Sequence, residues 1–439
     1  MKIIQRKINY YLITLILSGI SCLTQAQEVN YLNLAKKYFN ELDSICSVDN
    51  GKLWGKTLYG PTMIVVPDKK LIIANTADKN NALKPKDGLF IGTLPDNLGI
   101  ANTSVEWNGI NWTMVNWNSI SENDPYGRKK LFVHESWHSI QKSIGVNSIM
   151  TSNFHLDECE GSILLKLEFM ALKNAISSDN IEAKKTHLFN SLTIRKYRQL
   201  KFPNNNENDF ERHEGMAEYT GFKLCGLNNL MATRIIAKQL ELAINKEGLA
   251  NSFAYLSGPA YGFIFDEFSE NWKEQTIQGK DIPEIANQLM GFNISSDTLE
   301  LKSLLSGYIV TYNAESLIKS ETEKFEKQKA LVIEYKKKFL DGEKLIIPNN
   351  NLYFTFNPQE KLVSLDNSGV VYKTLRLTGD WGILEVSNGI FRSNDWQYFI
   401  VVAPKSGLSG TIQEPDYKLI LKDDWKVVNI KEGKYTIKK

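Results

Sequence analysis

Two histidines and a glutamate lie within the five-residue segment His134-Glu-Ser-Trp-His138. Residues four apart on an α-helix lie on the same face, so both imidazoles can bind one tetrahedral zinc ion. Glu135 is placed to accept a proton from water that the metal acidifies and to pass it to a leaving group. The segment therefore predicts a hydrolytic site with one Zn²⁺ per chain, and the alternative is a helix with two surface histidines.

The residues around this segment favour a helix that holds the histidines beside a buried face. Asp124 can cap its start, and Pro125 suits the first turn. Apolar residues then recur at helical spacing. They are Val133, Trp137, Ile140 and Ile144.

A catalytic zinc ion of this type needs a third protein ligand and one open position. The segment His213-Glu-Gly-Met-Ala-Glu-Tyr-Thr220 offers two carboxylates, Glu214 and Glu218, on one helical face. Either carboxylate could reach the metal. The alternative is that both lie on the surface of an amphipathic helix.

The pairing of the two segments resembles the gluzincin metallopeptidases, particularly the aminopeptidase N family. The second motif of that family is Asn-Glu-Gly-Phe-Ala followed by tyrosine or a similar residue, and Glu214-Gly-Met-Ala-Glu-Tyr219 is similar to it. The resemblance covers about residues 101–268 and implies that Glu214 is the third ligand. Glu218 then becomes a neighbour that orients the site.

The family also has a Tyr-x-Lys-Gly-Ala segment, whose tyrosine hydroxyl stabilises the oxyanion at the attacked carbonyl. The segment Tyr255-Leu-Ser-Gly-Pro-Ala260 is similar to it. The resemblance thus implies this catalytic role for Tyr255, a contribution of roughly 3 kcal/mol. The alternative is a core tyrosine beside Tyr261 and Phe263.

Three features depart from the family pattern. A long insertion of 75 residues, 139–213, separates His138 from Glu214. The Gly-x-Met-Glu-Asn strand that binds a substrate amino terminus is missing from the sequence, so exopeptidase action does not carry over. His213 replaces the asparagine before Glu214, which introduces a competing ligand.

Within the insertion, Glu160 and Glu168 are eight residues apart on a leucine-rich helix. These carboxylates could orient the zinc histidines or bind a substrate amine. The favoured alternative is a solvated stripe with an ion pair to Arg195 or Lys166. His155 and His187 are interpreted as ordinary polar residues.

The hydrophobic pattern predicts an α+β chain. Short β runs between residues 58 and 120 indicate an antiparallel sheet, with a hairpin turn at Asn108-Gly-Ile-Asn111. Helical spacing follows to about residue 342, notably over 156–175, 231–244 and 282–289. Lysine-rich residues 315–340 read as a solvated helix that ends this region, and β runs beyond residue 346 predict a small sandwich.

These patterns and the resemblance together predict a thermolysin-like catalytic region with a small all-β domain after it. Residues 27–123 would form its β-rich part, 124–342 its helical zinc-binding part and 346–439 the β domain. The expected function is an exported metallopeptidase, with the edge of the Trp112–Trp117 strand aligning the substrate backbone. The alternatives are a zinc hydrolase of another amide or ester, and an inactive exported binding protein.

Residues 1–26 have the parts of a signal peptide: basic residues, an apolar run at residues 10–20 and small residues toward Ala26. We therefore expect export and no membrane span after its removal; the alternatives are a retained anchor and a lipoprotein linked through Cys22. Three cysteines remain, Cys46, Cys159 and Cys225. Their odd number favours no disulfide framework, although Cys225 could pair with either of the others.

The formal net charge of the 439-residue chain is only +2, from 52 Lys and Arg against 50 Asp and Glu. Such a balance provides no field to hold a polyanion, so nucleic acid is excluded as a partner. Gly51-Lys-Leu-Trp-Gly-Lys-Thr57 looks like a phosphate-binding loop, but its first glycine is one residue too close, so no nucleotide is expected. The expected partner is a peptide or protein substrate.

Overall fold

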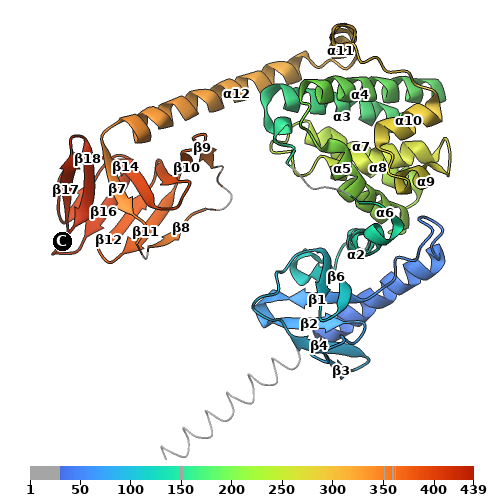
Figure 1. Ribbon diagram of the computed structural model, residues 1–439, viewed down its shortest axis with the longest axis horizontal. Helices are drawn as coiled ribbons and strands as arrows, with labels where there is room; N and C mark the ends of the chain where they lie inside the picture. Colours follow the sequence, from blue (N-terminus) through green and yellow to red (C-terminus); the bar gives the residue numbers. More distant parts are fainter. Residues whose placement is uncertain (1–29, 148–151, 351, 358–359, 361) are drawn as a thin grey trace, which may run out of the picture. The chain divides into compact units, whose positions relative to one another are not determined.

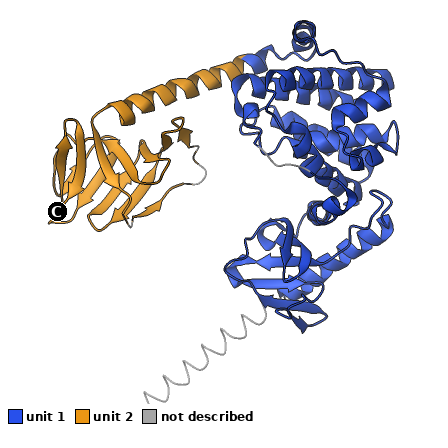
Figure 2. Cartoon of the chain, viewed as in Figure 1, with its two compact units in different colours: residues 1–318 blue, residues 319–439 orange. Residues whose placement is uncertain are grey.

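The computed structural model describes residues 30–147, 152–350, 352–357, 360 and 362–439 (Figure 1). The predicted signal peptide, with Cys22, lies outside these residues. The chain forms two compact units. The first unit ends at Ile318, and the second begins at Lys319 (Figure 2). The hydrophobic pattern of the sequence places the domain boundary at residues 342–346, where it changes from helical to strand-like. The boundary between the compact units lies earlier in the chain.

The first unit contains a six-stranded sheet in the order β3-β4-β2-β1-β6-β5. Its strands are β1 Thr62–Val66, β2 Leu71–Ala74, β3 Lys84–Lys86, β4 Leu89–Thr93, β5 Thr103–Trp107 and β6 Ile110–Asn116. The predicted antiparallel arrangement is wrong at one pair, because β1 and β6 run parallel. Strand β2 pairs antiparallel with one edge of β1, and β6 of the β5–β6 hairpin pairs with the other edge.

The hairpin turn predicted at Asn108-Gly109 is present, and both residues have positive φ, 48° and 74°. This is the geometry of a two-residue type I′ turn, which Asn-Gly favours. Because β6 lies between β1 and β5, the expected free edge of the Trp112–Trp117 strand is absent. The edge strand on this side of the sheet is β5.

Side chains of the sheet alternate between two cores, as the period of a strand requires. In β1, Ile64 and Val66 join the large core that the helices share, whereas Met63 and Val65 face a separate apolar cluster. The first face packs against helix α2, Pro125–Gln141, which contacts both β5 and β6. The sheet therefore supports the helix that carries the histidine segment.

Helices make up the rest of the first unit. A helix spans residues 30–49. After α2 follow α3 Cys159–Ser177, α4 Ile181–Lys201, α5 Glu207–Phe210, α6 Met216–Leu224, α7 Asn229–Ala243, α8 Ala254–Asp266, α9 Trp272–Ile277, α10 Ile282–Met290 and α11 Thr298–Thr311. A π-helical turn, Glu211–Gly215, joins α5 to α6. The helices thus occupy the three stretches in which the sequence showed helical spacing.

The insertion between the two candidate metal segments forms a helical hairpin, in which α3 and α4 pack along each other (Figure 1). The apolar residues of α3 that predicted this helix point inward. Leu165, Phe169 and Leu172 recur at helical spacing and are fully buried in the large core. The hairpin is therefore part of the core of the first unit.

The second unit contains two sheets. The seven-stranded sheet has the order β17-β18-β7-β14-β13-β10-β9, and the five-stranded sheet has the order β15-β16-β12-β11-β8. The strands are β7 Lys344–Pro348, β8 Tyr353–Thr355, β9 Val363–Ser364, β10 Gly369–Tyr372, β11 Leu375–Gly379, β12 Gly382–Val386, β13 Ile390–Ser393, β14 Tyr398–Val402, β15 Thr411–Gln413, β16 Tyr417–Leu421, β17 Lys426–Lys431 and β18 Lys434–Lys438. Buried side chains of both sheets share one core.

Helix α12, Glu315–Tyr335, precedes these strands and continues into a π-helical segment, Lys336–Asp341. Tyr335 and Phe339 are buried against residues of the seven-stranded sheet. Most of this helix therefore belongs to the second unit, although the sequence assigned it to the end of the helical region.

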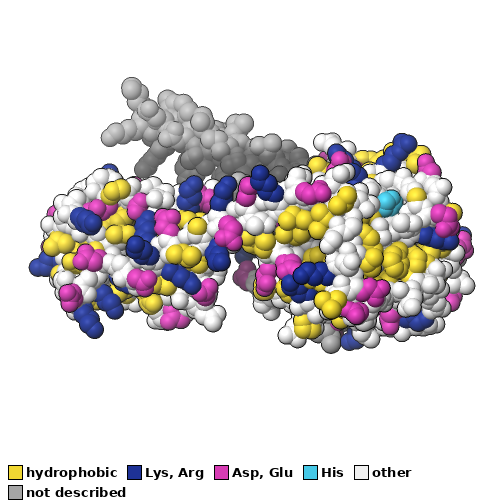
Figure 3. All heavy atoms as spheres, turned by 90° about the horizontal axis from the view of Figure 1, so that it is seen from above, with side chains coloured by type: hydrophobic (Ala, Val, Ile, Leu, Met, Phe, Trp, Pro, Cys, Tyr) yellow, Lys and Arg dark blue, Asp and Glu magenta, His cyan; other side chains and the backbone are white. Residues whose placement is uncertain are grey.

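The structure also bears on the cysteines, the loop-like segment 51–57, membrane-spanning helices and the surface charges. No disulfide joins the three cysteines of the described residues, and Cys46 and Cys225 are buried thiols. Residues 51–57 form turns without a helix after them. Among the described helices, none has the length and apolar character needed to cross a bilayer. Lys, Arg, Asp and Glu side chains are interspersed on the visible face of both units (Figure 3).

Candidate metal centre

Helix α2 presents the two histidines on one side and buries the other. The side chain of Asp124 accepts a hydrogen bond from the Gly127 amide at the start of the helix, and Pro125 follows, as predicted. Val133 and Trp137 are fully buried. The side chains of His134 and His138 are only 6% and 7% exposed, so they approach each other in a largely dry environment.

Three donor atoms form a compact triangle. Nε2 of His134 lies 3.3 Å from Nε2 of His138. Oε2 of Glu214 lies 3.3 Å from the first nitrogen and 3.6 Å from the second. Zinc bonds of about 2.0–2.2 Å at tetrahedral angles place neighbouring donors about 3.3–3.6 Å apart. The cluster His134, His138 and Glu214 can therefore hold a metal ion.

One oxygen of this triangle is chemically unsatisfied in the protein alone. Oε2 of Glu214 is buried and lacks a conventional hydrogen-bond partner within the described residues. A buried carboxylate oxygen without a donor is costly, and a cation satisfies it. The donor set of two imidazoles and one carboxylate is also one that zinc commonly takes in catalytic sites.

The remaining nitrogens of the histidines face hydrogen-bond acceptors. Nδ1 of His134 lies 3.0 Å from Oε2 of Glu218, and Nδ1 of His138 lies 3.2 Å from Oε1 of Gln141. Lys130 contacts the other oxygen of Glu218. Acceptors at Nδ1 direct Nε2 toward a metal and fix the ring orientation. Glu218 thus contacts the back of His134, while Glu214 contributes to the donor triangle.

The electrostatics of the site match the binding of a cation. Burial would lower the pKa of His134, but the adjacent carboxylates of Glu214 and Glu218 outweigh burial and raise it to about 9. Burial alone would raise the pKa of Glu214, yet its contacts with the two histidines hold it well below the ordinary range. Both shifts have the direction expected where carboxylates favour a positive charge between Glu214 and Glu218.

Glu135 lies beside the donor triangle as the helix geometry predicts. It is buried, and its Oε2 has no hydrogen-bond partner among the described residues. Burial raises the pKa of this carboxyl group, against the opposing effect of His134 and His138. A free, desolvated carboxylate oxygen next to a metal site is suited to exchange protons with water.

Tyr255 lies in the first turn of α8, against the metal cluster. Its ring stacks on that of His134 with centroids 5.5 Å apart and an interplanar angle of 2°. The carboxyl group of Glu214 lies close enough to its hydroxyl to affect the pKa of Tyr255. Burial and the nearby Glu214 raise the pKa of Tyr255 far above its ordinary value, so the hydroxyl keeps its proton and can act as a donor. Tyr261 is fully buried and contacts Glu168 instead.

His213 lies next to the cluster without completing it. Its ring centroid is 4.6 Å from that of His138, and its Nε2 is 3.5 Å from Oε1 of Glu214. Burial and the neighbouring His138 lower the pKa of His213 to about 4. The imidazole expected as a competing ligand is therefore close to the cluster but outside the triangle of donor atoms.

The two carboxylates of the insertion lie away from the donor triangle. Glu160 forms a surface ion pair with Lys201. Glu168 is fully buried and pairs with Arg195 and Arg198. The expected pairing of Glu168 with Arg195 is present, but the solvated stripe is wrong for Glu168, because α8 covers that face of α3 and Tyr261 bonds to the carboxylate.

Sequence reasoning missed a buried ionic cluster that contains Glu168. Its other members are Arg195, Arg198, Glu207 and Glu211, all fully buried. His155 joins it through a 2.8 Å contact with Glu207, whereas His187 bonds to Tyr312 elsewhere. The sequence did contain a signal for this cluster. Two arginines three residues apart, and two glutamates four residues apart, each lie on one face of a helix that otherwise forms core.

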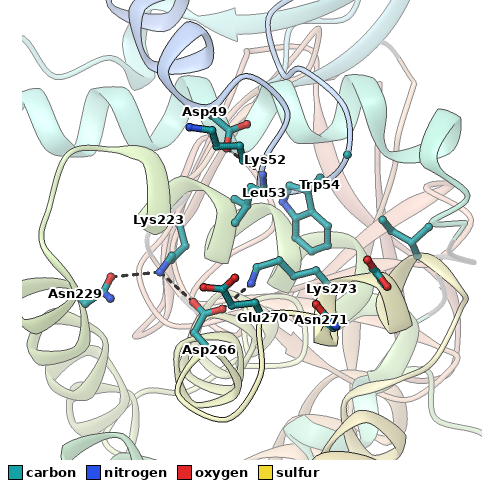
Figure 4. Close-up of a pocket in the computed structure, with 13 residues that line it drawn as sticks. Asp49, Lys52, Leu53, Trp54, Lys223, Asn229, Asp266, Glu270, Asn271 and Lys273 are labelled. Carbon is teal, nitrogen blue, oxygen red and sulfur yellow. Dashed lines mark hydrogen bonds and ion pairs between the residues drawn. The ribbon is translucent and has the colours of Figure 1, made fainter.

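A cavity of about 590 Å³ lies near α6, α8 and α9, but none of the donor residues lines it (Figure 4). Lys223 and Lys273 approach Asp266 on one wall, opposite Trp54. Trp54 packs on Trp137, which lies on the buried face of α2. The lining residues are Asp49, Lys52, Leu53, Trp54, Gly55, Lys223, Asn229, Asp266, Glu270, Asn271, Lys273, Glu274 and Ile277.

No protein-family model matches the chain, and no curated protein or solved structure matches it either.

Proposed function

We propose that this protein is an exported zinc metallopeptidase of the gluzincin type, with a thermolysin-like arrangement of sheet and helices in its first unit. The observation that carries the proposal is the donor triangle of His134, His138 and Glu214, with the buried and unpartnered oxygen of Glu135 beside it. The resemblance of both zinc segments to gluzincin motifs supports the same assignment. Export is supported by the signal-like pattern of residues 1–26.

When bound, zinc supplies Lewis-acid chemistry, because it polarises a carbonyl group and lowers the pKa of water to near 7. Glu135 accepts the proton of the attacking water and passes it to the leaving amine. The protonated hydroxyl of Tyr255 donates a hydrogen bond to the developing oxyanion. Glu218 and Gln141 hold the two imidazoles in the orientation that the reaction needs.

The edge strand β5 is the surface that we propose for aligning an extended substrate. In a hairpin closed by a two-residue turn, Trp107 and Ile110 form a hydrogen-bonded pair, so the main-chain groups of Ser104 and Glu106 face outward. An extended peptide can add to such an edge as a further strand. Asn111 of the same hairpin donates to the Ser139 carbonyl of α2, which supports a fixed relation between edge and metal site.

The first test is metal content and peptide hydrolysis by the purified chain. We expect about one zinc per chain, lost in His134→Ala, and cleavage of a mixture of internally quenched peptides. An ester substrate hydrolysed without any peptide cleavage would favour the alternative of another zinc hydrolase. Stoichiometric zinc without turnover of either substrate class would favour an inactive binding protein.

The second test separates the base from the ligands. Glu135→Gln should keep zinc, because the donor triangle is intact, but should lower kcat by about 10²–10⁴-fold because the base is removed. Zinc content by atomic absorption and kcat on the same preparation provide the measurement. Loss of zinc in this variant, or an unchanged kcat, would contradict the proposed role of Glu135.

A further inference from the structure

We propose that the α3–α4 hairpin positions the metal ligand Glu214 through a buried chain of ion pairs that ends on Glu211. The inference rests on the proposed function, since it gives the inserted hairpin a task at the same metal centre. Glu211 and Arg195 are positioning residues, since neither belongs to the donor triangle. They act through the π-helical turn that carries Glu214.

The chain of ion pairs starts in α3 and crosses α4. Glu168 of α3 accepts hydrogen bonds from Arg195 Nε at 3.0 Å and from Arg198 Nη2 at 2.6 Å, both in α4. Arg198 also binds Glu207 at 2.6 Å. Arg195 binds Oε1 of Glu211 at 2.6 Å and contacts its other oxygen as well. Each guanidinium therefore bridges two carboxylates in a fixed, planar geometry.

Glu211 begins the π-helical turn Glu211–Gly215, and Glu214 is its fourth residue. A π-helical turn departs from the regular hydrogen bonding of the helix, so it needs support from its surroundings, and such turns are frequent at functional sites. The carboxylate of Glu211 receives that support from Arg195 and from the hydroxyl of Ser257 in α8. The start of the turn is thereby anchored to both the hairpin and α8.

The end of the turn is anchored by a close crossing of two glycines. A Cβ atom on Gly258 would lie 2.3 Å from the Cα of Gly215, a distance that real structures do not show. Helix α8 therefore touches the turn through backbone at Gly258 and through the adjacent Ser257. Tyr255, one turn earlier in α8, stacks on the ring of the neighbouring donor His134. Glu214 thus lies between two anchors, only one of which depends on ionic contacts.

Burial of the ionic cluster carries a large desolvation penalty. Apolar side chains could fill the same volume without this penalty. Replacing buried ion pairs with apolar residues is therefore often neutral or stabilising. Five fully buried charged groups next to the π-helical turn therefore suggest a geometric task. A carboxylate held by a planar guanidinium and a hydroxyl has few orientations available, which restricts the turn that follows it.

The test measures zinc affinity by competition with a chromogenic chelator in the full-length protein. The variants are Glu211→Gln, which keeps the shape of the side chain, and Ser257→Ala, which leaves every ion pair in place. Glu160→Gln is the matched control, because it removes a surface carboxylate of the same hairpin. We expect zinc affinity to fall by about 10–100-fold in the first variant and by a smaller factor in the second, with the control unchanged.

Two further readouts separate positioning from general stability. The visible absorption of the Co²⁺-substituted protein reports ligand geometry, and we expect its band to shift in Glu211→Gln and Ser257→Ala. Far-UV circular dichroism of the metal-free variants verifies that they are folded at the assay temperature. A folded Glu211→Gln with the zinc affinity and Co²⁺ spectrum of the wild type would overturn the inference. Absence of zinc binding in the wild type would instead overturn the proposed function.

Discussion

Glu214 and Glu218 are one helical turn apart, yet the fold gives them different surroundings. Glu214 contributes an oxygen to the donor triangle, and Glu218 contacts the far nitrogen of His134 and Lys130. A carboxylate that orients a ligand typically contributes 10–100-fold to metal affinity, less than a ligand itself. We therefore expect Glu214→Ala to weaken zinc binding more than Glu218→Ala, as measured by chelator competition. The reverse order would transfer the ligand role to Glu218.

Tyr255 offers a test of catalysis that does not depend on metal content. Loss of a single oxyanion donor typically lowers kcat by about 10²–10³-fold. Tyr255→Phe should show a decrease of this size with zinc retained, because the ring that stacks on His134 remains. Steady-state kinetics and metal analysis of one preparation measure both quantities. Unchanged kcat would make Tyr255 a packing residue.

Asp266 provides a pH-dependent contribution to stability away from the metal. Burial would raise its pKa, but hydrogen bonds from Lys273 and Trp272 outweigh burial and lower it. A lowered pKa in the folded state stabilises the protein above the unfolded value of about 3.9, and this stabilisation is lost as the pH falls below it. The carboxylate therefore contributes most near neutral pH.

Asp266→Asn should accordingly reduce the free energy of unfolding by about 1–3 kcal/mol at pH 7, because hydrogen bonds to a charged group are lost. The difference from the wild type should shrink as the pH falls below about 3.9. Urea unfolding at several pH values measures it. A difference that is constant from pH 7 to pH 3 would mean that the charge of Asp266 is not involved.

At the scale of elements, the contact between the π-helical turn, α6 and α8 determines where the second metal segment lies. Gly215 meets Gly258, and Gly262 of α8 lies against the Tyr219 ring, where a Cβ atom would be 2.4 Å from a ring carbon. Two glycines at spacing four thus let α8 approach the backbone of the π-helical turn and the Tyr219 ring of α6. This approach brings Tyr255 to Glu214 and Ser257 to Glu211.

Gly258→Ala should destabilise the protein by about 1–3 kcal/mol, because the added methyl group overpacks the crossing. Zinc affinity should fall as well, since the turn that carries Glu214 must shift. Gly307→Ala in α11 is the matched control, because a Cβ atom there meets nothing within 4 Å. Thermal unfolding with and without zinc measures both effects. Equal behaviour of the two variants would show that the crossing tolerates a side chain.

At the scale of the whole molecule, the two units have separate cores, and only the first contains the donor cluster. A ligand that binds only the folded state stabilises the unit to which it binds, by about 2.7 kcal/mol at 100 times its Kd. Calorimetry should therefore resolve two transitions, of which zinc raises only one.

The zinc-dependent transition should lose its shift in His134→Ala, while the other transition stays in place. Addition of a chelator to the wild type should have the same effect as this substitution. Two transitions that move together on adding zinc would show that the units unfold as one, contrary to their separate cores.

Local patterns in the sequence were sufficient for the histidine helix. Its cap at Asp124, the buried stripe through Val133 and Trp137, and the pairing of His134 with His138 all follow from the spacing of a single helix. The type I′ turn at Asn108-Gly109 is equally local, since it depends on the positive φ that these residues tolerate. Interactions within a few residues of one another can be predicted from their order in the chain.

Contacts between distant segments were decided only by the tertiary structure. The parallel pairing of β1 with β6, and hence the edge position of β5, depends on where a hairpin docks. The burial of Glu168 depends on α8 covering α3, which no pattern within α3 reveals. The sequence by itself thus determined which residues could bind a metal and act as a base. The packing of helices far apart in the chain decided which carboxylate joins the donors and which ion pairs hold the adjacent turn, because burial and partners are properties of the assembled fold.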